Sequence, residues 1–154
     1  MKIVITESQY NILKENKLRN VIINISSEYS KKYGCSVWDI NNGYCGDFAD
    51  DVIQEFGGES DSLYILSDDM FFNFREPEFA IENWDGIIET PFGVWSKKML
   101  DLYGYPPVDI NKIDDEISHN WIYYNGKHYD AETPNGVDNW FELPIMINFF
   151  NQYN

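Results

Sequence analysis

Cys45 is the residue of this sequence best placed for nucleophilic chemistry. It follows Asn42-Gly43-Tyr44 and opens a run with helical spacing of apolar residues, so we expect a helix to begin at Cys45 or Gly46. The apolar stripe of that helix is Phe48, Ala49, Val52, Ile53 and Phe56. A helix N-terminus favours the reactive thiolate, and its N–H groups suit a developing oxyanion. The position therefore predicts a nucleophile, and a small, inert buried cysteine is the alternative.

A tight turn at Asn125-Gly126 is predicted between two strand-like runs, residues 119–124 and 127–131. An Asn-Gly pair between such runs is a strong hairpin signal, because both turn residues need positive φ. Tyr124 then pairs with Lys127, and every step away from the turn adds one more pair.

This pairing places His119 beside two carboxylates. Continued outward, it sets Trp121 opposite Asp130 and His119 opposite Glu132. Because side chains alternate along a strand, His119 shares a face with both acids, and its Cα lies diagonal to that of Asp130 at ~7–8 Å. A carboxylate that orients a histidine is what a Cys–His nucleophile requires. We therefore expect His119 to be the base, with Asp130 as its partner and Glu132 as the rival; a surface histidine beside solvated acids is the alternative.

Other chemistry finds less support. His128 is the only other histidine, and its place beside the turn indicates an exposed residue rather than the base. Two histidines and two cysteines, widely spread, do not predict a metal site, and no cofactor motif is present. Asp68-Asp69 and Asp114-Asp115-Glu116 are interpreted as solvated acidic turns rather than a cation site.

Three segments, in this order, resemble papain-like and transglutaminase-like cysteine enzymes. They are Asn42-Gly43-Tyr44-Cys45-Gly46-Asp47-Phe48-Ala49, His119-Asn120-Trp121 and Gly126-Lys127-His128-Tyr129-Asp130-Ala131-Glu132. The resemblance implies a papain-like fold, with Cys45 as nucleophile, His119 as general base and acid, and Asp130 as the orienting residue. It also implies a protein or peptide substrate.

The sequence departs from papain at the oxyanion hole. Papain has a glutamine six residues before its cysteine, and the same position here is Asp39, which is a poor donor when ionised. Asn41 or Asn42 is the expected replacement, together with the backbone N–H of Cys45. Trp121 is expected either to shield the catalytic pair, or to line the substrate cleft, or to belong to the ordinary core.

The opening decapeptide, Met1 to Tyr10, is similar to the start of many small tailed-phage proteins. This resemblance implies a viral protein that acts in a bacterial host, with a host protein as the candidate substrate.

The remaining pattern predicts an α+β fold in one domain, residues 1–154, with N-terminal helices packed against a small C-terminal antiparallel sheet. We expect a short helix over 6–16, a second over 18–33 and a loop over 35–44. A strand over 62–66 and a helix over 94–103 are also expected.

The net charge of the chain limits the classes of partner that we expect. Twenty-six acidic and eleven basic side chains give a formal net charge of −15, which disfavours nucleic acid and anionic membranes. No signal peptide and no long apolar run are visible, so a cytoplasmic protein with free thiols is expected.

Two functions follow. The first is a cysteine-dependent hydrolase or acyltransferase that acts on an amide, isopeptide or thioester bond, of the cysteine protease or amidase type, with deamidation or transglutaminase-like transfer as variants. The second is an acidic phage-encoded binding protein that inhibits a host factor through a non-catalytic papain-like fold. The net charge of −15 and the aromatic stretch from Phe71 to Trp84 favour the second.

Overall fold

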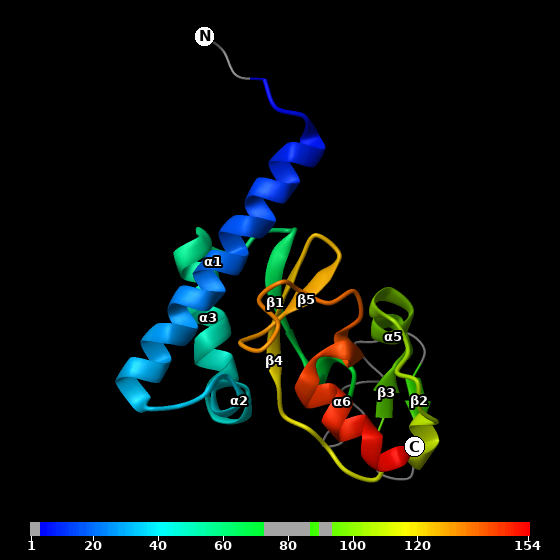
Figure 1. Ribbon diagram of the computed structural model, residues 1–154. Coiled ribbons are helices and arrows are strands. Elements are labelled where there is room, and N and C mark those ends of the chain that lie inside the picture. Colours follow the sequence, from blue (N-terminus) through cyan, green and yellow to red (C-terminus); the bar gives the residue numbers. More distant parts are fainter. Residues whose placement is uncertain (1–3, 73–86, 90–93) are drawn as a thin grey trace.

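The computed structural model describes residues 4–72, 87–89 and 94–154. Figure 1 shows a small antiparallel sheet standing between two groups of helices, with strand order β1-β4-β5. Its strands are β1 (Leu63–Ser67), β4 (Asn120–Tyr124) and β5 (Lys127–Tyr129). The predicted α+β class is confirmed. N-terminal helices followed by a C-terminal sheet were predicted, and that order is incomplete. The sheet takes β1 from the middle of the chain, and helix α6 (Pro144–Phe150) follows β5 near the C-terminus.

Helix α1 (Glu7–Tyr33) is continuous, so the two helices expected over 6–33 are one. Thr6 and Gln9 form the predicted capping box, and Gly34 ends the helix with φ 69°. No glycine or proline interrupts the chain between these two signals, and the apolar residues of the second half anchor the whole helix to the core.

The expected loop over 35–44 is helical, and that prediction is wrong. Ser36 and Asp39 form a second capping box that starts α2 (Val37–Asp39). A π-helical segment, η1 (Ile40–Tyr44), then leads into α3 (Cys45–Phe56). Asn41-Asn42-Gly43 suggested a turn, but the chain accommodates these residues in the wider π-helical geometry.

The β4–β5 hairpin forms as predicted close to its turn. Asn125 and Gly126 have φ 50° and 81°, and three pairs hold the strands together. The pairs are Tyr124 with Lys127, Tyr123 with His128, and Ile122 with Tyr129. Beyond Tyr129 the ladder stops, so the predicted pairs at Asp130 and Glu132 do not form. On its other edge, β4 pairs with β1.

The sheet separates two hydrophobic clusters. One joins α1 and α3 to Leu63, Ile122 and Tyr124. The other joins Leu66 and Trp121 to the C-terminal helix α6 (Pro144–Phe150). Because Trp121 and Ile122 are neighbours on β4 and point to opposite faces, one strand serves both clusters.

The middle of the chain differs from the expected helix over 94–103. Residues Val94–Ser96 form β3, paired with β2 (Ile87–Glu89), and helix α5 (Lys97–Tyr103) follows directly. The Ser96 hydroxyl accepts a hydrogen bond from the Met99 N–H and so caps α5.

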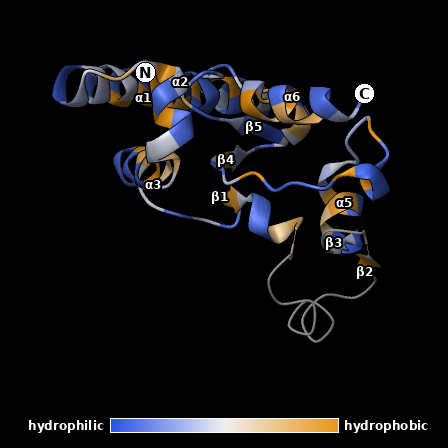
Figure 2. Cartoon of the chain, turned by 90° about the horizontal axis from the view of Figure 1, so that it is seen from below, coloured by the Kyte–Doolittle hydropathy of each residue, from blue (hydrophilic) through white to orange (hydrophobic). Residues whose placement is uncertain are grey.

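Figure 2 shows hydrophobic and hydrophilic residues alternating around α1 and α6, as expected for helices with one covered face. Within the described part of the chain, no helix has the length and apolar character needed to cross a bilayer.

Candidate active site

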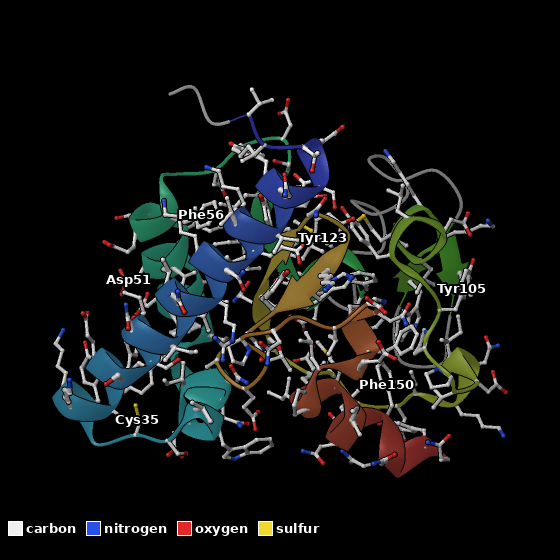
Figure 3. All side chains as sticks on the ribbon, turned by 45° about the horizontal axis from the view of Figure 1, so that its top comes forward. Cys35, Asp51, Phe56, Tyr105, Tyr123 and Phe150 are labelled. Carbon is white, nitrogen blue, oxygen red and sulfur yellow. The ribbon has the colours of Figure 1, made fainter. Side chains whose placement is uncertain are left out.

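Cys45 is the first residue of α3 and is partly buried. The helix was predicted to begin here, and this is confirmed. Tyr44 breaks the regular geometry with φ −126° and ψ 11°, and thereby sets α3 off from the π-helical segment. The other thiol, Cys35, lies in the turn between α1 and α2, well away from the sheet (Figure 3).

His119 directly precedes β4 and is fully buried. Its backbone is fixed from both sides by Asp68, which follows β1. The His119 N–H donates to Asp68 Oδ1 at 3.0 Å, and the Asp68 N–H donates to the His119 carbonyl at 3.2 Å. The imidazole stacks on the ring of Trp121, with centroids 5.9 Å apart. Both the backbone and the ring of His119 therefore have a defined position.

Asp130 is the carboxylate that contacts His119, with 3.3 Å between Oδ2 and Nε2. The other oxygen, Oδ1, accepts three hydrogen bonds: from the N–H of Glu132 at 3.0 Å, and from the N–H and hydroxyl of Thr133 at 2.8 and 2.7 Å. These bonds form a tight turn after Tyr129, which explains why the strand ends there. The turn leaves Oδ2 to the imidazole alone among the described residues.

The charges of Cys45 and His119 favour an ion pair. Burial alone would raise the pKa of the Cys45 thiol, but the interactions with His119 and Asn120 outweigh it and lower that pKa. Burial alone would lower the pKa of His119, yet Asp130 and Cys45 together raise it to about 9. Since Nε2 faces Asp130, Nδ1 is the nitrogen left for the sulfur, and this buried atom makes no hydrogen bond to any of the described residues. The directions of these two pKa shifts favour a thiolate paired with an imidazolium.

Asn120 is a site residue that the sequence analysis missed. Its Nδ2 lies 3.9 Å from Cys45 Sγ, at the limit of a hydrogen bond to sulfur. A Cβ placed on Gly46 would lie 3.5 Å from the same nitrogen, so the amide sits over the first turn of α3. Strand alternation was the available signal, because the residue after His119 must point to the opposite face of β4, where α3 packs.

The two expected oxyanion donors lie elsewhere, and that prediction is corrected. Asn41 is fully buried; its Nδ2 donates to Glu132 Oε2 at 3.0 Å, and its Oδ1 accepts from the Ala131 N–H at 3.3 Å. Asn42 donates its Nδ2 to the carbonyl of Trp38 at 2.9 Å. Asn41 thus ties η1 to the loop that carries Asp130, and its amide group is occupied.

Glu132 is not the partner of His119. It accepts the amide of Asn41 instead, because the turn at Asp130 takes it out of the strand register. The choice left open between the two carboxylates is therefore decided for Asp130 by contact.

Trp121 is completely buried and stacks behind His119, so it shields the histidine and does not line a cleft. Its Nε1 donates to Nδ1 of His128 at 2.9 Å. His128 is itself buried, contrary to the expected exposed turn, and burial lowers its pKa to about 4. The neutral His128 ring therefore acts as a hydrogen-bond acceptor and fixes the Trp121 side chain across the hairpin.

The acidic pair at 68–69 is also different from the expected solvated turn. Asp68 is buried, and burial raises the pKa of its carboxyl to about 6. No group of acidic, histidine or cysteine side chains suited to a metal ion occurs among the described residues. Of the aromatic stretch from 71 to 84, Phe71 and Phe72 are buried in the second cluster, and residues 73–84 lie outside the described residues. The described part of this stretch, Phe71 and Phe72, therefore does not form an exposed hydrophobic surface for binding a partner.

Comparisons of this chain with family models, curated proteins and solved structures found no match.

Proposed function

We propose that this protein is a cysteine-dependent hydrolase or acyltransferase acting on an amide, isopeptide or thioester bond. The observation that carries the proposal is the buried His119, which contacts Asp130 through Nε2, has no hydrogen-bond partner at Nδ1 among the described residues, and lowers the pKa of the Cys45 thiol. Cys45, His119 and Asp130 are of the residue types that acyl transfer uses as a nucleophile, a base and an orienting carboxylate.

The proposed reaction begins with attack of the Cys45 thiolate on the acyl carbon, which gives a tetrahedral oxyanion. Collapse of the oxyanion breaks the bond to the leaving group, which takes the proton held on His119 Nδ1. The acyl group remains on Cys45 as a thioester. Water or an amine then attacks the thioester, His119 accepts the proton of the attacking group, and Cys45 is released as thiolate.

Asn120 is the proposed side-chain donor to the oxyanion. A carbonyl carbon bound to Cys45 Sγ brings its oxygen within about 2.6 Å of the sulfur, and an amide nitrogen 3.9 Å from that sulfur can approach the oxygen to hydrogen-bond distance. The side-chain donor matters here because residues of a π-helical segment use N–H groups in i→i+5 bonds. The backbone just before Cys45 therefore offers fewer free donors than a separate helix N-terminus would.

Alkylation of the two thiols tests the nucleophile. In the Cys35→Ser protein only Cys45 can react, and in the matched Cys45→Ser control only Cys35 can react. At pH 6 we expect iodoacetamide to modify Cys45 about tenfold or more faster than Cys35, because the interactions with His119 and Asn120 lower the pKa of the Cys45 thiol. His119→Ala should abolish the difference. Equal rates for both thiols, with no effect of His119→Ala, would contradict the proposal.

Intact-mass measurement tests the acyl transfer itself. A panel of activated amides, isopeptides and thioesters should leave an acyl adduct on Cys45 that decays with water or amine, and Asn120→Ala should slow its formation about 100-fold. Asn20→Ala is the matched control, since Asn20 is exposed on α1 and lines neither the site nor the groove described below. An equal effect of the two substitutions would remove Asn120 from the mechanism.

A further inference from the structure

A groove of about 410 Å³ lies between the two parts of the chain that carry the proposed nucleophile and base. One wall comes from Trp38 and Asn42, on the helical segment that leads into Cys45. The other includes Ser118, directly before His119, together with Ile145 and Phe149 of α6. The groove is thus lined by residues close in sequence to both members of the proposed pair, Asn42 three positions before Cys45 and Ser118 directly before His119.

The walls suit an apolar side chain on an extended peptide. Trp38 is 41% exposed, whereas Trp95, Trp121 and Trp140 are completely buried. Across the groove from it, α6 contributes apolar residues. The amides of Asn148 and Gln152 also line the groove, and a primary amide can both donate to and accept from a peptide backbone. The groove thus combines an exposed aromatic surface with groups that bind main chain.

The rim of the groove is acidic. Glu116 lines it, and the two residues before it in the sequence, Asp114 and Asp115, are also exposed carboxylates. No lysine or arginine lines the groove within the described part of the chain. With a net charge of −15, this field attracts cations and repels anions as they approach.

We propose that this groove binds the substrate as a basic polypeptide segment, with an aromatic or large aliphatic side chain against Trp38 and lysine or arginine side chains at the rim formed by residues 114–116. The inference rests on the proposed function in one respect, because the bound segment is a substrate only for an enzyme of the proposed type. The binding itself does not depend on catalysis, and it is tested without it.

The experiment uses the full chain with Cys45→Ala and measures fluorescence anisotropy of labelled peptides. The peptides are Lys-Lys-Phe-Lys-Lys, its Glu-for-Lys counterpart and its Ala-for-Phe counterpart. We expect the basic aromatic peptide to bind at least about tenfold more tightly than the acidic one at low salt. We expect it to bind about fivefold more tightly than the alanine peptide, because the phenyl ring loses water against Trp38.

Matched substitutions separate the groove from general attraction to an acidic protein. Trp38→Ala should weaken binding about fivefold, and Tyr105→Ala should leave it unchanged, since Tyr105 is 46% exposed but does not line the groove. Asp115→Asn should weaken binding about twofold to threefold at low salt, and Asp61→Asn, an exposed residue with the same change in charge, should not.

Binding that ignores Trp38→Ala, or equal affinity for the basic and acidic peptides, would overturn the inference. Trp38-dependent binding by a protein whose Cys45 alkylates no faster than Cys35 would keep the groove and reject the catalytic function. Rapid alkylation of Cys45 without selectivity among the peptides would keep the catalytic function and reject the groove as the binding site.

Discussion

Replacing Asp130 with asparagine should disable the proposed ion pair, although asparagine differs from aspartate by one group. Oδ1 of Asp130 accepts from two N–H groups and one hydroxyl, so the asparagine oxygen must stay on that side. The new NH₂ then faces Nε2 of His119 and donates to it. An imidazole that accepts at Nε2 carries its proton on Nδ1, and a neutral ring in that state cannot take the proton of Cys45.

The size of the effect follows from the pKa of His119. The rise from 6.5 to about 9 corresponds to about 3.4 kcal/mol in favour of the protonated ring, at about 1.36 kcal/mol per tenfold change in proton affinity. Asp130 and Cys45 share this contribution, and a hydrogen bond to a charged group contributes roughly 1.5–3 kcal/mol. We therefore expect Asp130→Asn to lower the alkylation rate of Cys45 at pH 6 by about tenfold to 100-fold.

The assay is the pH profile of iodoacetamide reaction from pH 5 to 10, in the Cys35→Ser background. Because the pKa of His119 is raised, its stabilising protonation is complete below pH 6.5 and is lost as the pH rises through about 9. The rates of the Asp130→Asn protein and its parent should therefore converge above about pH 9. Below that pH, the variant should also unfold at a lower urea concentration.

Thr133→Val is the matched control. It removes one donor to Asp130 Oδ1 without changing the group that faces His119, so it should cost stability and leave the alkylation profile unchanged. A parental rate at pH 6 in the folded Asp130→Asn protein would refute the reasoning about the tautomer. An equal loss of rate in Thr133→Val would show that the turn, and not the carboxylate, is responsible.

Three further predictions concern stability. Asp68→Asn keeps the acceptor for the His119 N–H and removes a carboxyl whose pKa burial raises to about 6. As the pH rises from 3.8 through 6, the parent protein loses stability because the buried aspartate must ionise, whereas the asparagine variant does not. Urea denaturation should therefore show the variant about 3 kcal/mol more stable than the parent at pH 8 and equally stable at pH 3.5. His128→Gln should make the fold less sensitive to acid. With a pKa of about 4, the neutral histidine stabilises the fold fully above pH 6.5, and about 3.4 kcal/mol of stability is lost as the pH falls through 4. Equal slopes of unfolding free energy against pH for variant and parent, from pH 6.5 to 4, would count against a buried neutral ring. Gly136→Ala should cost about 2–4 kcal/mol by thermal denaturation, because Gly136 has φ 71° and a Cβ there would lie 2.6 Å from the Tyr129 ring; an unchanged melting temperature would contradict this.

Local signals predicted the parts of the fold that depend on near neighbours. The capping box at Thr6, the helix end at Gly34 and the turn at Asn125-Gly126 all appear where the sequence places them. Each depends on side chains and φ values within a few residues, which the sequence states directly. The continuity of α1 and the helical character of residues 37–44 were missed, because packing against the core decides whether a weak local preference becomes helix or loop.

The candidate site divides in the same way. The sequence by itself determined the residue types and their local positions: a cysteine that begins a helix, a histidine just before a hairpin strand, and acids after the second strand. Only the tertiary structure decided which acid contacts His119. The ladder ends at Tyr129 because Asp130 turns its own backbone, and that turn brings Asp130 to the imidazole and sends Glu132 to Asn41.

Asn120 and Asp68 show the reason most clearly. Asn120 meets the sulfur across 75 residues of chain, and Asp68 meets the His119 backbone across 51. Strand alternation indicates the face of β4 on which Asn120 lies, but neither partner can be read from the local sequence, since the contacts arise from the packing of α3 on β4 and the pairing of β1 with β4. The sequence determined the nucleophile and base as candidates, and the burial and long-range contacts of the fold decided their partners and the direction of their pKa shifts.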